Sequence, residues 1–204
     1  MAAEASNNEA NRVAIISPRY CCTYPVNLAI MRKMITDGNF DVQDVNGTVI
    51  FTVDKILPTF VHQRKLILDP VGNTILTLRK KAVTAIDTWQ VFRGESEELE
   101  DLIFTAKRHS LMDINTQLDV FLANNKNEQI CDFKIKGTFL EESCDIYAGD
   151  KDSAPIIAKM QKRPSAEILF FGKTNFMVRV NPNVDHAFIV ALVVILDEML
   201  VVNY

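Results

Sequence analysis

The chain carries one run of ten successive residues without a polar group, Ala187-Phe-Ile-Val-Ala-Leu-Val-Val-Ile-Leu196. As a helix, this run would make nearly three turns and measure about 15 Å. That is roughly half the thickness of the hydrocarbon core of a bilayer. Extending the helix further brings in Asp197 and Glu198, and carboxylates are costly at membrane depth. We therefore expect a helix buried in protein and no transmembrane span.

A helix that is apolar on every side must be covered on every side. The stretch from His186 to Leu200 is long for a strand, and Asn183 or Asp185 can supply the N-cap of a helix. His186 is expected to be a cap or first-turn residue. The residues expected to form the buried central helix are Ala187, Phe188, Ile189, Ala191, Leu192, Val193, Ile195 and Leu196.

The chain before this helix has the pattern of short antiparallel strands, because apolar and polar residues alternate in many segments. Asn46-Gly47 and the stretch 69–73 are typical of hairpin turns. One short helix is expected over Asn27–Ile35. Strands are predicted at residues 39–45, 48–53, 66–68, 74–78, 88–93, 101–107, 117–123, 131–136, 143–147, 156–161, 167–171 and 176–181. The predicted fold is mainly β, a closed antiparallel barrel around the C-terminal helix.

Composition narrows the class of protein. The chain has 204 residues, 48% of them hydrophobic and 24% charged, which is ordinary for a globular protein with a large core. The net charge of -4 gives no overall positive surplus for binding nucleic acid, so no nucleic-acid partner is expected. Residues 1–18 are predicted to be a disordered polar tail without the pattern of a secretory signal, and residues 19–204 a single domain. We expect a monomer in the cytoplasm, with the membrane periphery or the nucleus as further locations.

The four cysteines form no Cys-x-x-Cys pair and are expected to be small buried hydrophobes. S-acylation of the adjacent Cys21 and Cys22 is the alternative for that pair. The Asp37–Asp44 segment resembles half a calcium loop, but Val42 stands where the loop needs glycine. No serine-hydrolase elbow or phosphate-binding loop occurs, and the three histidines are scattered. We therefore expect no catalytic residue, no metal and no cofactor.

Clusters of basic residues at strand ends are the remaining candidate sites. An isolated triplet binds an anionic leaflet only marginally, whereas two converging triplets would bind it appreciably. Such residues also serve as solvated strand ends that discourage aggregation. A further basic cluster lies at 159–163. The candidate lipid-binding residues are Arg79, Lys80, Lys81, Lys107, Arg108, Lys134 and Lys136.

Several motifs, in order along the chain, resemble the plant LURP-one-related proteins. They are Cys22-Thr-Tyr-Pro-Val-Asn-Leu28, Asp37-Gly-Asn-Phe40, Asp44-Val-Asn-Gly47, Trp89-Gln-Val-Phe-Arg-Gly94, Leu118-Asp-Val-Phe-Leu122, Cys131-Asp-Phe-Lys-Ile-Lys-Gly137, Tyr147-Ala-Gly149 and the segment 182–197. The resemblance implies a tubby-like barrel of about twelve strands around a hydrophobic helix. The wider superfamily includes phospholipid scramblases and the phosphoinositide-binding tubby proteins, and the founder of the family is linked to basal defence.

Three functions are consistent with this resemblance. The first is a non-enzymatic module that docks on anionic membrane lipid and serves defence signalling. The second is a scaffold for an unidentified protein partner, with no role for lipid. The third, ranked last, is a lipid scramblase, because a barrel with a buried helix offers no hydrophilic path across a bilayer.

Overall fold

The computed structural model describes residues 12–33, 39–59, 62–82, 84–109, 115–138, 143–151, 153–163 and 175–201. Their elements are η1 (Pro18–Tyr20), β1 (Val26–Arg32), β2 (Phe40–Gln43), β3 (Val49–Thr59), β4 (His62–Leu68), β5 (Thr74–Lys80), β6 (Thr88–Arg93), η2 (Leu99–Asp101), β7 (Leu102–Arg108), β8 (Asn115–Leu122), β9 (Phe133–Thr138), β10 (Ser143–Tyr147), β11 (Ile156–Arg163), β12 (Asn175–Val180) and α3 (His186–Val201).

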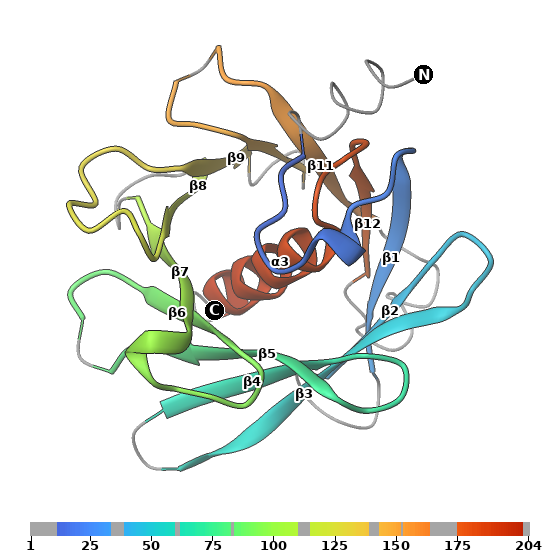
Figure 1. Cartoon of the computed structure of the whole chain (residues 1–204), viewed down its shortest axis with the longest axis horizontal. Coiled ribbons are helices and arrows are strands. Elements are labelled where there is room, and N and C mark those ends of the chain that lie inside the picture. The colour runs from blue at the N-terminus through green and yellow to red at the C-terminus, as the bar shows by residue number, and fades with distance from the viewer. Residues whose placement is uncertain are drawn as a thin grey trace.

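The described strands form a closed antiparallel barrel, in which sequential strands are neighbours and β1 closes the ring by pairing with β12 (Figure 1). Closure leaves no strand edge unpaired. The expected fold class is therefore confirmed. We call the barrel end at which α3 begins the N-mouth and the opposite end the C-mouth. The turns between β2 and β3, β4 and β5, β6 and β7, β8 and β9, and β10 and β11 all lie at the N-mouth, because successive strands run in opposite directions.

The predicted helix over Asn27–Ile35 is wrong, because its first half is strand β1. Leu28 and Ile30 are fully buried, while the residues between them are more exposed. This period of two points alternate side chains into the barrel. Pairing with β2 and β12 fixes the segment as a strand. The strand predicted at 167–171 lies outside the described residues, whereas both predicted hairpin turns are present.

The α3 helix fills the barrel, as the apolar run predicts (Figure 1). Every residue from Ala187 to Leu196 is at most 2% exposed. Near the start of α3, the ring of Phe188 packs against the rings of Phe104 on β7 and Phe133 on β9, with centroids 5.2 and 4.9 Å away. No helix among the described residues is long and apolar enough to cross a membrane.

Asp185 anchors both the helix and the N-terminal segment. Its Oδ1 accepts hydrogen bonds from the backbone N–H groups of Ala187 and Phe188, which makes it the N-cap of α3. Its Oδ2 accepts hydrogen bonds from the N–H groups of Ile15, Ile16 and Ser17. The Asp185 side chain is fully buried, and its charge is satisfied entirely by backbone donors from two separate segments.

These contacts correct the predicted limit of the N-terminal tail. Residues 12–22, which we call the strap, lie across the N-mouth against the start of α3 (Figure 1). Val13 forms a bridge with Val184, and the side chain of Ile16 is buried. Residues 12–18, which were expected to belong to the tail, therefore pack against the barrel. The apolar run Val13-Ala-Ile-Ile16 is the sequence signal of this packing, since Ile16 is buried and Val13 and Ile15 pack against the core.

Buried charges meet at the C-mouth, where α3 ends. Asp197 pairs with Arg32 of β1, and Glu198 accepts from Lys65 of β4 at 2.6 Å. Burial raises the pKa of the Asp197 carboxyl, although Arg32 opposes the shift. Burial likewise lowers the pKa of Lys65, against the attraction of Glu198. The Lys65 ammonium also lies 4.9 Å from the centre of the Phe40 ring.

The position of Ala191 tests the buried helix directly. This residue is fully buried at the middle of α3, so Ala191→Arg would place an unpaired charge inside the barrel. We expect this variant to yield no soluble folded protein in expression and circular-dichroism measurements. Val45→Arg is the matched control, because Val45 is 73% exposed at a hairpin tip and should tolerate the charge. A soluble, cooperatively unfolding Ala191→Arg protein would contradict the structure.

His186 predicts a dependence of stability on pH. Its ring lies 5.6 Å from the rings of both Tyr20 and Phe51, and burial lowers its pKa below 6.5. The unfolded chain therefore binds a proton at this site more readily than the folded one does. The contribution of neutral His186 to the free energy of unfolding is complete above pH 6.5. It should decline as the pH falls from there toward the folded-state pKa of His186. Urea unfolding between pH 7.5 and 5.5 should show a shallower decline for His186→Phe than for the wild type; parallel profiles would refute this assignment.

Candidate functional site

Among the described residues, α3 fills the interior of the barrel, and its residues from Ala187 to Leu196 are at most 2% exposed. Among the described residues, no group of three or more histidine, cysteine, aspartate or glutamate side chains could hold a metal ion. Cys131 and Cys144 are buried, and burial raises the pKa of each thiol to about 12. Cys21 is half-buried, and the pKa of its thiol is raised to about 11, mainly by burial and to a smaller extent by the negative charge of Asp185. These thiols are poor nucleophiles, so candidate sites lie on the outer surface.

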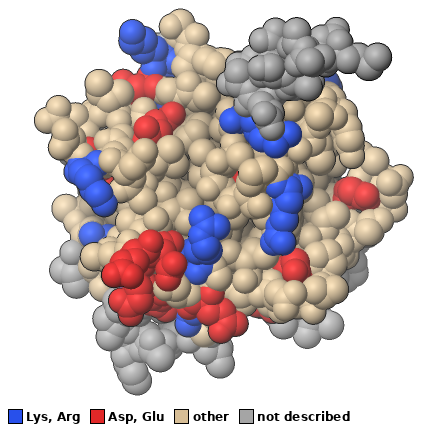
Figure 2. All heavy atoms as spheres, in the orientation of Figure 1, with Lys and Arg blue, Asp and Glu red and all other residues tan. Residues whose placement is uncertain are grey.

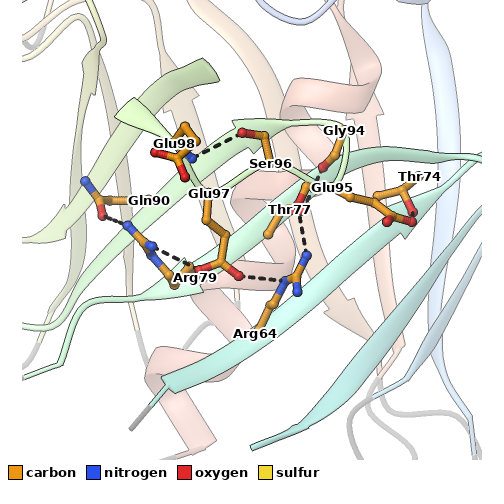
Figure 3. A network of polar contacts seen from close by, with 10 residues as sticks. All are labelled: Arg64, Thr74, Thr77, Arg79, Gln90, Gly94, Glu95, Ser96, Glu97 and Glu98. Carbon is orange, nitrogen blue, oxygen red and sulfur yellow. Dashed lines mark hydrogen bonds and ion pairs between the residues drawn. The ribbon is translucent and has the colours of Figure 1, made fainter. Parts of the chain in front are cut away.

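Arg79 faces outward from β5 and contacts three other side chains, two of which are drawn in Figure 3. Its guanidinium donates to Glu97 and to Gln90, each at 2.9 Å, and lies 4.7 Å from the centre of the Phe92 ring. Arg64 on β4 approaches the same Glu97 carboxylate at 3.1 Å. Arg79, a candidate lipid-binding residue from the sequence, is thus engaged in a network of the protein's own residues.

The loop between β6 and β7 brings Glu97 onto the outer face of β4 and β5. Thr77 donates to the Gly94 carbonyl at 2.7 Å, and Thr74 donates to Glu95 at 3.0 Å (Figure 3). The loop therefore lies along β4 and β5 instead of projecting freely. Glu97, in the acidic run at 95–101, forms ion pairs with both Arg64 and Arg79.

Three other candidate lysines are also paired. Lys80 contacts Asp87 at 2.7 Å, Lys107 contacts Glu128, and Lys134 contacts Asp150. Lys134 is only 8% exposed. Lys81 and Arg108 form no ion pair with another residue in the described part of the chain, and they lie on either side of the start of β6, where their backbone N–H groups bond to Thr88 and Asp87.

Lys136 belongs to a second arrangement, on the outer wall of β9 to β12. The strand registers align Lys136 with Asp145, Asp145 with Lys159, and Lys159 with Arg179. Ile135, Ile146, Ala158 and Val180, their neighbours along the strands, are at most 1% exposed and point inward. The aligned charged residues therefore point outward. We call Lys136, Lys159 and Arg179 the basic row.

The basic row spans about 15 Å, because four adjacent strands are spaced about 4.8 Å apart. Lys159 is 62% exposed despite its 3.2 Å contact with Asp145, and Arg179 is exposed. Arg179 was not among the residues selected from the sequence. The alternation in Phe176-Met-Val-Arg-Val180 places it on the outer face, but only the register brings it beside Lys159.

Comparison with known proteins decides the family. Residues 26–197 match the family described as LURP-one-related. Protein LURP-one-related 15 of Arabidopsis thaliana is 48% identical over 188 residues, which cover 91% of this chain and 85% of that protein. The chain belongs to the LURP-one-related family. The resemblance carried by the sequence motifs is thereby confirmed.

Other LURP-one-related proteins agree in extent and in fold. Protein LURP1 of Arabidopsis thaliana is 48% identical over 188 residues, covering 91% of this chain and 89% of LURP1. The X-ray structure of another Arabidopsis thaliana protein superposes with a TM-score of 0.71 at 44% identity, covering 91% of this chain and 98% of that one. The LURP-one-related match at 26–197 runs from β1 into α3 and begins after the strap.

The Arg79–Glu97 pair should contribute measurably to stability. Arg79→Met and Glu97→Gln, alone and combined, form a double-mutant cycle in urea unfolding. We expect a coupling free energy of about 1 kcal/mol, the upper end for partly exposed pairs, because a second arginine and an aromatic ring order the geometry. The Lys159–Asp145 pair is the control and should give a coupling near zero, since Lys159 is largely exposed. Equal couplings for the two pairs would show that the network adds nothing.

Proposed function

We propose that this protein is a non-enzymatic, tubby-like module of plant defence signalling that docks on anionic phospholipid membranes through the basic row. The observation that carries the proposal is the register that aligns Lys136, Lys159 and Arg179 on one outer wall. Asp145 is the one acidic residue within that alignment. The three cations can face a membrane together without any change in the barrel.

Exposure distinguishes Lys159 and Arg179 from other basic residues, because the Lys159 side chain is 62% exposed despite its contact with Asp145, and Arg179 is exposed. A lysine or arginine close to an anionic leaflet contributes about 1 kcal/mol of binding free energy. The side chains of Arg79, Lys80, Lys107 and Lys134 face carboxylates of the same chain and are only 10 to 32% exposed, so they reach a leaflet less easily than Lys159 does. Lys81 and Arg108 lie beside the start of β6, and β8 lies between them and the basic row, so they are not part of this docking surface. The strand register keeps Lys136 in the proposed surface and adds Lys159 and Arg179.

Two further features support the non-enzymatic and defence parts of the proposal. The core is filled by α3, and the described thiols with raised pKa values are poor nucleophiles. The relatives include LURP1, and the resemblance links the founder of the family to basal defence. We place docking at the cytoplasmic face of a membrane.

Vesicle co-sedimentation tests the docking. The full chain is mixed with vesicles of phosphatidylcholine alone or with added phosphoinositide, at low and at high salt. Binding should appear only with phosphoinositide and should weaken with salt, because screening shortens the reach of surface charges. Lys159→Glu with Arg179→Glu should reduce binding by at least about thirtyfold, since two contributions of about 1 kcal/mol are lost and replaced by repulsion.

Lys126→Glu with Lys151→Glu is the matched control. Both lysines are exposed in loops at the N-mouth, and the double variant changes the net charge by the same amount. It should bind vesicles almost as well as the wild type. Equal losses of vesicle binding for the two double variants would show that only net charge matters. That result would refute docking through the basic row. Failure of the wild type to bind either vesicle would favour a scaffold that uses protein partners alone.

A further inference from the structure

A pocket of about 330 Å³ opens at the N-mouth, on a different face from the basic row. It lies between the strap, the η2 turn and the start of the loop between β8 and β9. Apolar groups of Ile15, Leu102, Ile103 and Leu122 line part of it. The other lining residues are Ala14, Arg93, Glu100, Asp101, Ala123 and Asn124. Its volume is at the lower end for ligand pockets, which suits a single side chain better than a large molecule.

The charged groups around this pocket favour a cation. The carboxylates of Glu100 and Asp101 form no ion pair or hydrogen bond with another side chain in the described part of the chain. Arg93 also lines the pocket, and its guanidinium donates to the Ile16 carbonyl at 3.2 Å; the two carboxylates exceed its single positive charge. Acidic side chains gather over the loop between β6 and β7, next to the pocket (Figure 2). An anionic lipid headgroup would be repelled from this part of the surface.

Exposed apolar side chains lie on the two loops beside the pocket. Leu99 in η2 is 72% exposed between the exposed carboxylates of Glu98 and Glu100. Ile130 in the loop between β8 and β9 is 68% exposed. Leu99 directly precedes the pocket-lining Glu100, and Ile130 belongs to the loop that contributes Ala123 and Asn124 to the pocket, so both can add apolar area to a partner that enters it.

The walls of the pocket are fixed before any partner binds. Asp132 accepts from the backbone N–H of Leu122 and from the Asn125 amide, both at 2.9 Å, which holds the loop between β8 and β9. Asp185 holds the strap through three backbone hydrogen bonds. A partner would therefore lose little free energy in ordering this surface.

We propose that the N-mouth pocket binds a basic segment of a partner protein, in which a lysine or arginine alternates with apolar residues. The aliphatic stem of the partner's cation packs on Ile15 and Leu102, and its charged head faces Glu100 and Asp101. The partner's apolar residues cover Leu99 and Ile130. This site is independent of lipid docking, so the module can face a membrane with one surface and a protein with another.

Fluorescence anisotropy of a labelled peptide tests the proposal with the full chain. The probe is an eight-residue peptide of alternating leucine and lysine, and the comparison peptide alternates leucine and glutamate. The lysine peptide should bind in a salt-sensitive manner and the glutamate peptide should not. Glu100→Lys should weaken binding of the lysine peptide at least fivefold, and Leu99→Ser should weaken it without a change in charge.

Asp145→Lys is the control, since it changes the net charge as Glu100→Lys does but lies on the distant wall of β10. It should weaken binding less than twofold. Amide shifts in NMR spectra should centre on residues 14–15, 99–103 and 122–124. The proposal is overturned if the lysine peptide does not bind, if both charge reversals weaken it equally, or if the shifts centre on β9 to β12. Unfolding temperatures of the variants close to that of the wild type exclude misfolding as the cause.

Discussion

A helix without a polar side needs apolar cover in every direction, and this requirement governs the whole architecture. A single sheet or a helix pair would leave part of α3 in water, whereas a closed barrel surrounds it. Closure in turn pairs every strand with two neighbours and removes the interior as a place for ligands. The surface chemistry of the molecule is thus confined to the outer wall and the two mouths. Both surfaces proposed for binding follow from that restriction.

The features that could be predicted from the sequence are those set by local chemistry. The all-apolar run identified α3, and Asn46-Gly47 identified a hairpin, because neither depends on distant residues. The segment that begins at Asn27 was misassigned because Leu28, Ile30, Met31 and Met34 fit a helical spacing as well as a strand. Pairing with β12, far along the chain, decides between the two. Local patterns contain no information on such a partner.

The candidate site shows the same limit. A basic residue can be located from sequence, but whether it is neutralised depends on which loop folds over it. Arg79 meets a carboxylate 18 residues away, and Lys107 meets one 21 residues away. Likewise, Arg179 became a candidate only when the register placed it beside Lys159. The alternation along a strand predicts on which face of the sheet a side chain lies. Only the register between strands determines which side chains lie next to it.

The ion pairs at the C-mouth add directional contacts to the apolar packing that orients α3. Hydrophobic burial itself has no direction, so it distinguishes poorly between rotations of a helix that is apolar on every side. Asp197 is tied to Arg32 on β1 and Glu198 to Lys65 on β4, so consecutive helix residues reach toward two different strands. Together with the hydrogen bonds of Asp185 at the other end, these pairs fix the rotation of the helix about its own axis. We therefore expect these desolvated pairs to specify one setting of the helix more than to add stability.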